Sequence, residues 1–96
     1  MTLLSDEHVT AALRELGNWT RRGEALERTF TCRSYADAMA AVVRLGFAAE
    51  AADHHPDVAW SYRTVTLRFT THSEGGITAR DVAGAASAER AFAPFV

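Results

Sequence analysis

The chain of 96 residues is long enough for one hydrophobic core and too short for two, so we expect a single domain over residues 1–96. Hydrophobic residues make up 48% of the sequence and charged residues 23%, a composition typical of globular proteins and not of disordered ones. The formal net charge of −2 provides no basic field that would attract nucleic acid or an anionic membrane surface.

Cysteine content and hydropathy indicate the compartment. Cys32 is the only cysteine, which excludes an intramolecular disulfide and a thiolate metal cage. The first residues lack the basic and apolar regions of a signal peptide, and no apolar run approaches the ~20 residues of a membrane span. We therefore expect a soluble, cytoplasmic protein.

The first third of the chain is predicted to form a short helix and two strands. Ser5 is a candidate helix cap followed by acidic residues, and Gly17 ends this helix. Trp19 then belongs to a short strand, and a turn at 22–24 follows. Residues 26–31 alternate in the manner of a second strand.

The longest predicted helix begins at Ser34 and runs to about Asp53. It must end before Pro56, because a proline disfavours the helical conformation of the residue before it. Apolar residues at helical spacing give this helix one apolar face, which consists of Tyr35, Met39, Val42, Val43 and Phe47.

The segment after Pro56 contains two alternating apolar sets, Val58, Trp60 and Tyr62 at even positions and Val65, Leu67 and Phe69 at odd positions. One continuous strand would place the two sets on opposite faces of a sheet. A two-residue turn at Arg63-Thr64 instead makes Tyr62 and Val65 cross-strand neighbours and brings all six onto one face. We therefore predict a hairpin.

The last third is predicted to be a loop and a helix. Gly75-Gly76 forms the loop, Thr78 caps the helix, and Asp81 completes a capping box with Thr78. The helix then carries Val82, Ala85, Ala86, Glu89 and Phe92. The predicted order is αββαββα, an α+β fold in which three helices pack on one face of a four-stranded antiparallel sheet.

An unusual polar stretch, Glu50-Ala-Ala-Asp-His54-His55-Pro56, follows the longest predicted helix. Glu50 and His54 are four residues apart, so on a helix they lie on the same side and interact. The dipole at a helix C-terminus and a neighbouring carboxylate both favour the protonated imidazole, as a general acid requires. His72, at the end of a strand, is the candidate second proton carrier.

Each of these residues also has a purely structural interpretation. A Glu–His pair at this spacing is common on helix surfaces, two histidines before a proline fit a helix exit, and His72 fits an exposed strand end. Capping alone explains Asp81, which favours a structural role over a catalytic one, and His8 fits the surface of the first helix. Residue chemistry alone leaves both interpretations open.

A family resemblance adds to this chemistry. The pattern Glu50-x-x-x-His54-His55-Pro56, Tyr62, Thr71-His72 and Gly75-Gly76-Ile77-Thr78-x-x-Asp81 resembles the signature of the pterin-4a-carbinolamine dehydratases, also known as dimerisation cofactors of a homeodomain transcription factor. Residues 4–7, 17–19 and 26–30 extend the resemblance over nearly the whole chain. The departures are Val58, Trp60 and the pair Arg63-Thr64, none of which is an acid–base group.

The resemblance implies a hydro-lyase that dehydrates 4a-hydroxytetrahydropterin to quinonoid dihydropterin in tetrahydrobiopterin recycling. It implies His54 and His72 as general acid and base, His55 as the residue that orients the pterin, and Glu50 as the residue that holds His54 protonated. The remaining implied substrate contacts are Pro56, Thr71, Ser73 and Glu74, and Asp81 is implied as structural support of the site. The reaction needs no metal and no cofactor.

The resemblance also implies a homodimer or homotetramer, and two other functions stay open. The chain is an alternative candidate for an oligomeric protein-interaction module, similar to a transcription cofactor, with an idle pterin site. Retention of Glu50, His54, His55 and His72 argues against this. The third candidate is a metal enzyme, for which adjacent His54 and His55 would have to point the same way with a further carboxylate nearby.

Overall fold

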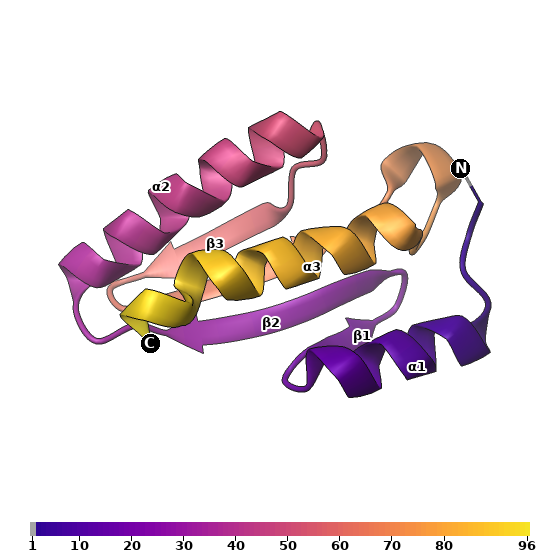
Figure 1. The fold of residues 1–96 in the computed structure, drawn as a ribbon, viewed down its shortest axis with the longest axis horizontal. Helices are drawn as coiled ribbons and strands as arrows, with labels where there is room; N and C mark the ends of the chain where they lie inside the picture. The colour runs from indigo at the N-terminus through magenta and orange to yellow at the C-terminus, as the bar shows by residue number, and fades with distance from the viewer. Residues whose placement is uncertain (1) are drawn as a thin grey trace.

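The computed structural model describes residues 2–96, in which three α-helices cover one face of a four-stranded sheet (Figure 1). The elements are α1 (Asp6–Leu16), β1 (Thr20–Arg22), β2 (Ala25–Thr31), α2 (Tyr35–Ala52), β3 (Asp57–Ser61), β4 (Thr64–Phe69), the 3₁₀ turn η1 (His72–Glu74), α3 (Ala79–Phe92) and the 3₁₀ turn η2 (Ala93–Phe95). All neighbouring strands are antiparallel, in the order β1-β2-β4-β3. The predicted fold is therefore confirmed.

The helices begin and end where local chemistry places them. Ser5 Oγ accepts a hydrogen bond from the backbone N–H of His8 at 3.2 Å, and Ser34 Oγ accepts one from Asp37 at 3.0 Å. Both contacts satisfy amides that have no partner inside the helix. Gly17 ends α1 with a φ of 71°, a conformation that glycine adopts without a steric penalty.

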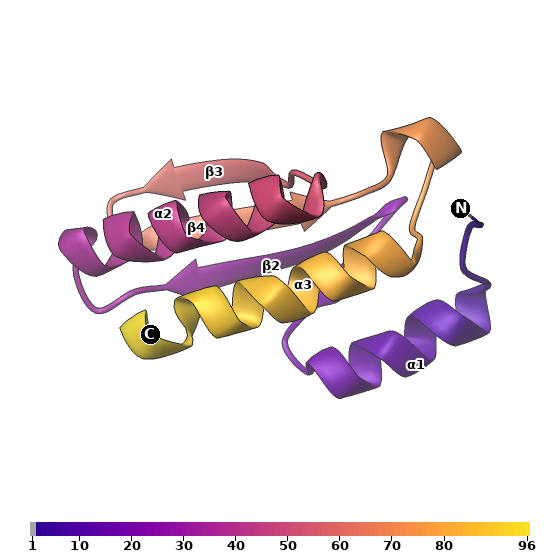
Figure 2. The same cartoon turned by 45° about the horizontal axis from the view of Figure 1, so that its top comes forward.

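The core lies between the sheet and the helices, which Figure 2 shows as two layers. Phe30 of β2 stacks on Phe92 of α3 with ring centroids 4.2 Å apart, and Trp19, immediately before β1, packs edge-on against Phe30. At Gly84, α3 comes so close to β4 that an added Cβ would lie 2.4 Å from Cε1 of Phe69. Glycine is thus required where the helix meets the ring.

The predicted hairpin forms from β3 and β4, but its turn lies one residue earlier than predicted. Tyr62 and Arg63 are the central residues in place of Arg63 and Thr64, and the cross-strand partner of Val65 is Trp60 in place of Tyr62. Tyr62 has a φ of 52°, because the first central residue of such tight turns takes a positive φ. The cross-strand partner of Val65 thus changes by two residues, from Tyr62 to Trp60, and a change by an even number keeps the same side chains on the core face. Trp60 therefore still packs against the core, whereas Tyr62 is 68% exposed.

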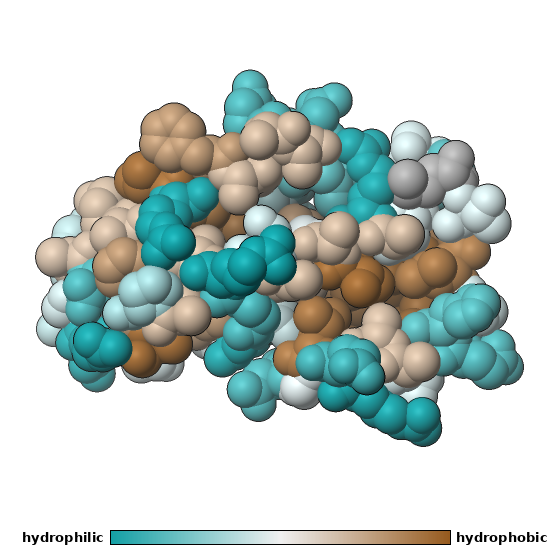
Figure 3. All heavy atoms as spheres, viewed as in Figure 1, coloured by the Kyte–Doolittle hydropathy of each residue, from teal (hydrophilic) through white to brown (hydrophobic). Residues whose placement is uncertain are grey.

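The buried face of α2 differs from the apolar face predicted for it. The residues of α2 that are buried are Ala38, Ala41, Leu45 and Ala49. The larger apolar residues Tyr35, Met39, Val43 and Phe47, here called the α2 apolar stripe, are exposed. Figure 3 shows apolar side chains on the surface over α2. Small residues let α2 approach α3 and the sheet closely, and the larger ones are left outside.

Within residues 2–96, no helix has the length and apolar character needed to cross a membrane.

Candidate active site

The end of α2 turns the chain back toward α3. Asp53 takes the left-handed conformation, with a φ of 50°, which Asp and Asn tolerate better than most residues. Its N–H donates to the carbonyl of Glu50, and the N–H of His54 donates to that of Ala49, each at 3.1 Å. This pair of bonds is a Schellman motif, which reverses the chain after a helix. As a result, His54 no longer follows the periodicity of α2.

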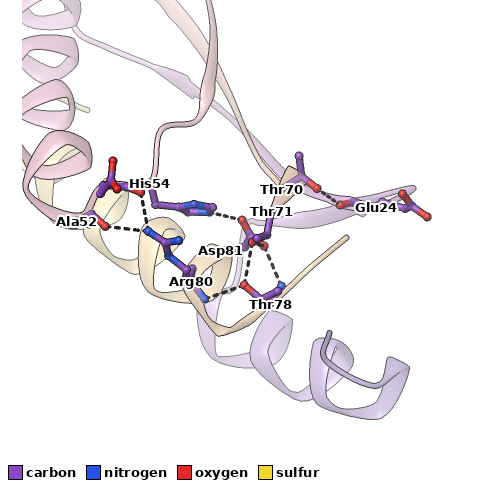
Figure 4. Close-up of polar contacts among 9 residues, drawn as sticks. Glu24, Ala52, His54, Thr70, Thr71, Thr78, Arg80 and Asp81 are labelled. Atoms are coloured by element: carbon purple, nitrogen blue, oxygen red, sulfur yellow. Dashed lines mark hydrogen bonds and ion pairs between the residues drawn. The ribbon is translucent and has the colours of Figure 1, made fainter. Parts of the chain in front are cut away.

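Asp81, in the first turn of α3, is the centre of a buried hydrogen-bond network (Figure 4). Its Oδ1 lies 2.6 Å from Nε2 of His54. Its Oδ2 accepts from the Thr71 hydroxyl and from the backbone N–H of Thr78, both at 2.8 Å. Asp81 is fully buried, so these three partners compensate for the water that its carboxylate has lost.

Arg80 fastens the start of α3 to the end of α2. Its Nη2 donates to the carbonyl of Asp53 at 2.6 Å and to that of Ala52 at 3.2 Å. A cation is favoured at a helix C-terminus, where the carbonyls have no partner inside the helix. In Figure 4 these contacts lie beside the His54–Asp81 contact, so Arg80 and Asp81 hold the turn at His54 from two sides.

The predicted Glu50–His54 pair is wrong. Glu50 Oε1 lies 2.7 Å from Nε2 of His55, and the two side chains are 79% and 55% exposed. The reversal at Asp53 is the physical reason, because it removes His54 from the helical face of Glu50. The carboxylate that meets His54 belongs to Asp81. The capping box predicted for Asp81 is confirmed, but capping is only part of what this side chain does.

The second predicted proton carrier, His72, is exposed at the start of η1. Thr71, the residue before it, is buried and bound to Asp81, and a bridge between Thr71 and Gly76 closes the loop. Asp81 therefore connects the segments that carry His54 and His72. In the part of the chain that the structure describes, no hydrogen bond or ion pair joins the His72 side chain to His54.

A cavity of about 300 Å³ lies between α2 and α3. Its lining residues are Leu45, Ala48, Ala49, Ala52, His54, Phe69, Arg80, Ala83, Gly84, Ser87 and Arg90, and it is called the α2–α3 groove below. The His54 ring stacks on the Phe69 ring with centroids 6.0 Å apart. His54 thus forms one end of a hollow that sequence analysis did not predict, because its walls are mostly alanines that meet only in the folded chain.

The arrangement is suited to proton transfer. The side chain of His54 is 10% exposed, and Asp81 fixes its orientation and its hydrogen-bonded nitrogen. A histidine held by a carboxylate at the rim of a cavity is a typical general acid or base. Across residues 2–96, no three His, Cys, Asp or Glu side chains are grouped so as to hold a metal ion.

Comparisons with known proteins show the family and the fold. The model of the family described as pterin 4 alpha carbinolamine dehydratase matches residues 2–91. A relative from Mycobacteroides abscessus named for that activity is 48% identical over 83 residues, 86% of this chain and 88% of the relative. One from Nocardia farcinica is 49% identical over 80 residues, 83% and 84% of the two chains. The crystal structure of a transcriptional coactivator/pterin dehydratase from Brucella melitensis matches with a TM-score of 0.90 and 29% identity, and the match covers 94% of this chain and 98% of that one.

Proposed function

The chain belongs to the pterin-4a-carbinolamine dehydratase family and is a hydro-lyase, and we propose that histidine acid–base catalysis performs its reaction. In this proposal it converts 4a-hydroxytetrahydropterin to quinonoid dihydropterin, as a cytoplasmic step in tetrahydrobiopterin recycling. The observation that carries the proposal is the 2.6 Å contact between His54 and the buried carboxylate of Asp81 at the rim of a cavity.

The reaction requires two proton movements and no change in oxidation state of the protein. The C4a–O bond breaks as a proton reaches the leaving hydroxyl, which departs as water. The N5–H proton is removed, and its bonding electrons form the new double bond between N5 and C4a. One proton is donated and one is accepted, so the total number of protons on the protein is unchanged, and proton exchange with solvent returns the acid and the base to their starting forms. We assign these two roles to His54 and His72.

The carboxylates support the histidines in a different arrangement from the one predicted. The carboxylate beside His54 belongs to Asp81 and not to Glu50, and it holds the ring of His54 in place. Glu50 instead contacts His55, the residue assigned to orient the pterin. A carboxylate thus orients each of the two histidines that follow α2.

The polar edges of the pterin ring need hydrogen-bond partners at the surface between His55 and η1. Ser73 of η1 is exposed, and Glu74 and Pro56 are half-buried, which suits them to substrate contact. The hydroxyl of Thr71 is occupied by Asp81 and Thr78. We therefore assign Thr71 to support of Asp81.

Turnover of chemically generated 4a-carbinolamine tests this function. His54→Ala and His72→Ala are each expected to lower kcat by ~10²–10⁴, the usual contribution of general acid–base catalysis. Circular dichroism and molar mass should stay unchanged in both variants. Near-native turnover of both would refute the assignment. Loss of activity on EDTA treatment, with recovery on adding zinc, would favour the metal enzyme instead.

The α2 apolar stripe supports a proposed homodimer or homotetramer. Its four side chains are between 42% and 76% exposed, and a contiguous apolar surface of this kind marks protein contacts. The same surface favours the alternative of an interaction module with an idle pterin site, since the Brucella melitensis protein carries both descriptions. Absence of wild-type turnover, with a stable oligomer, would favour the module.

A further inference from the structure

The α2–α3 groove extends well beyond the reacting histidine. Arg80 contacts the carbonyl of Asp53 at the end of α2, so His54 and Arg80 mark one end of the groove. Leu45 and Arg90 mark the other, because α2 and α3 lie side by side and run in opposite directions (Figure 1). Ten residues of α3 separate the two arginines, which corresponds to about 15 Å along the helix axis. A pterin ring at His54 would fill only part of this length.

The walls of the groove are apolar and its rim is cationic. Ala48, Ala49, Ala52 and Ala83 present methyl groups, and Ser87 adds one hydroxyl. The charged side chains of the lining are both arginines. Arg80 is bound to the carbonyls at the end of α2, whereas Arg90 is exposed and, within residues 2–96, pairs with no carboxylate. The far end therefore offers a free cation to an anionic group.

The groove stays open when copies of the chain meet through the α2 apolar stripe. Successive helical residues are rotated by about 100°, so the stripe and the groove-lining residues of α2 are centred about 150° apart around the helix. A partner that packs on Met39, Val43 and Phe47 contacts the opposite side of α2. The groove is thus available in the proposed oligomer.

Building on the proposed function, we infer that the α2–α3 groove is a subsite for the C6 substituent of the pterin substrate. The substituent that fits is elongated, with an apolar or aromatic middle against the alanine walls and an anionic end at Arg90. The preferred substrates are then pterins with a long, acidic tail. A short polar tail leaves the walls uncovered and does not reach the far end.

Equilibrium binding of three dihydropterins tests this inference. The C6 substituent of 6-methyl-7,8-dihydropterin is short and uncharged. That of 7,8-dihydroneopterin monophosphate has an anionic end but no apolar middle, and that of 7,8-dihydrofolate has both an apolar middle and an anionic end. We expect wild-type protein to bind 7,8-dihydrofolate about tenfold more tightly than 6-methyl-7,8-dihydropterin, because the tail buries apolar surface as well as pairing with a cation.

Two variants address the wall and the cation separately. Arg90→Gln should lower the affinity ratio of 7,8-dihydrofolate to 6-methyl-7,8-dihydropterin by about two- to fivefold, as loss of an exposed ion pair does. Ala83→Leu, which fills the groove, should bring the ratio close to one. Arg14→Gln removes the same charge from α1, outside the groove, and should leave the ratio unchanged.

A wild-type ratio near one, or a ratio that neither groove variant changes, would overturn the inference. Equal affinity for 7,8-dihydroneopterin monophosphate and 7,8-dihydrofolate would also overturn it, because charge alone would then explain binding. Turnover of a short-tailed 4a-carbinolamine is measured in parallel. Turnover with a ratio near one rejects the groove alone, whereas the expected ratios without turnover reject the acid–base function and support the groove as a binding site.

Discussion

Asp81 and His54 lie 27 residues apart in the sequence, and their side chains meet at 2.6 Å in the interior. The same carboxylate caps α3 through the N–H of Thr78. One oxygen is thus directed at the proposed proton carrier and the other at the scaffold. We therefore propose that Asp81 has a kinetic role in addition to the structural one, whereas Glu50 contacts the exposed His55.

The roles of the two carboxylates that contact histidines, Asp81 and Glu50, can be compared by replacing each with the corresponding amide. Asp81→Asn keeps the size of the side chain but replaces the charged carboxylate beside His54 with a neutral amide. We expect kcat to fall by about 10²-fold, the lower end of what acid–base catalysis contributes. The free energy of unfolding should fall by about 1–3 kcal/mol, because buried partners lose a charged acceptor.

Glu50→Gln is the matched control on the exposed side. Its partner His55 is 55% exposed, so the pair contributes at most about 1 kcal/mol. We expect up to about a fivefold rise in KM from the same energy, with kcat changed by less than about twofold. Steady-state kinetics and urea unfolding measure both variants. If Glu50→Gln lowers kcat as much as Asp81→Asn, the assignment of Asp81 to His54 is wrong.

His55 is expected to act in binding rather than in proton transfer. His55→Ala should raise KM at least as much as it lowers kcat, because its assigned role is to hold the ring. His54→Ala should instead lower kcat while KM changes little. A His55→Ala variant with native KM and a strongly reduced kcat would show that His55 is itself a proton carrier.

The sequence predicted those features that depend on neighbouring residues. Ser5 and Thr78 cap their helices as predicted, the longest helix begins after Ser34, and Gly17 ends α1, because each of these residues acts on its immediate neighbours. The alternation of 58–69 predicted a hairpin, but nothing in Tyr62 signals the positive φ that sets the register. Local residue patterns therefore predicted the helices and strands but not the position of the hairpin turn.

Features that depend on distant segments were not predictable. The spacing of the large apolar residues predicts that they form the buried face of α2. The structure instead buries mainly alanines there, because α3 lies close beside α2. Capping explained Asp81 completely at the local level, so its contact with His54 left no signal in the sequence. The prediction that Glu50 contacts His54 was wrong for a related reason, since Asp53 between them takes the left-handed conformation and ends the helix.

Gly84→Ala should destabilise the protein although alanine is the better helix former. The new Cβ would lie 2.4 Å from Cε1 of Phe69, a buried ring with little room to move. Overpacking of this kind costs about 1–3 kcal/mol and outweighs a gain in helix propensity of up to about 1 kcal/mol. Gly46→Ala in α2 is the matched control, because its Cβ meets nothing within 4 Å in its own chain and should stabilise the protein; both variants are compared in the Phe47→Gln background, since Gly46 lies on the side of α2 that carries the apolar stripe. Equal stabilisation in both variants, measured by urea unfolding, would contradict the close approach.

The stability of the protein should fall in alkaline solution through Cys32. Burial, followed by the charge of Asp37, raises the pKa of this thiol above its ordinary value of 9.0. Above that pH the unfolded chain loses the thiol proton while the folded chain keeps it, so the free energy of unfolding decreases as the pH rises, by at most about 1.4 kcal/mol per pH unit. Urea unfolding between pH 8 and pH 10 should show a shallower decrease for Cys32→Ala than for the wild type. Parallel curves would refute the contribution.

The α2 apolar stripe should hold copies of the chain together. Phe47 is 76% exposed and Val43 is 49% exposed, and burying a side chain of this size contributes about 1.5–3 kcal/mol. In a symmetric contact each substitution acts in both copies, so Phe47→Gln should raise the dissociation constant by at least about 100-fold. Light scattering at micromolar concentration should show a multiple of 10.5 kDa for the wild type and a shift toward that mass for Phe47→Gln.

The control variant is Val96→Gln, which changes an apolar residue that is 43% exposed near η2 and should leave the mass unchanged. A wild-type mass of 10.5 kDa would refute the assembly, and an unchanged oligomer in Phe47→Gln would move the contact to another surface.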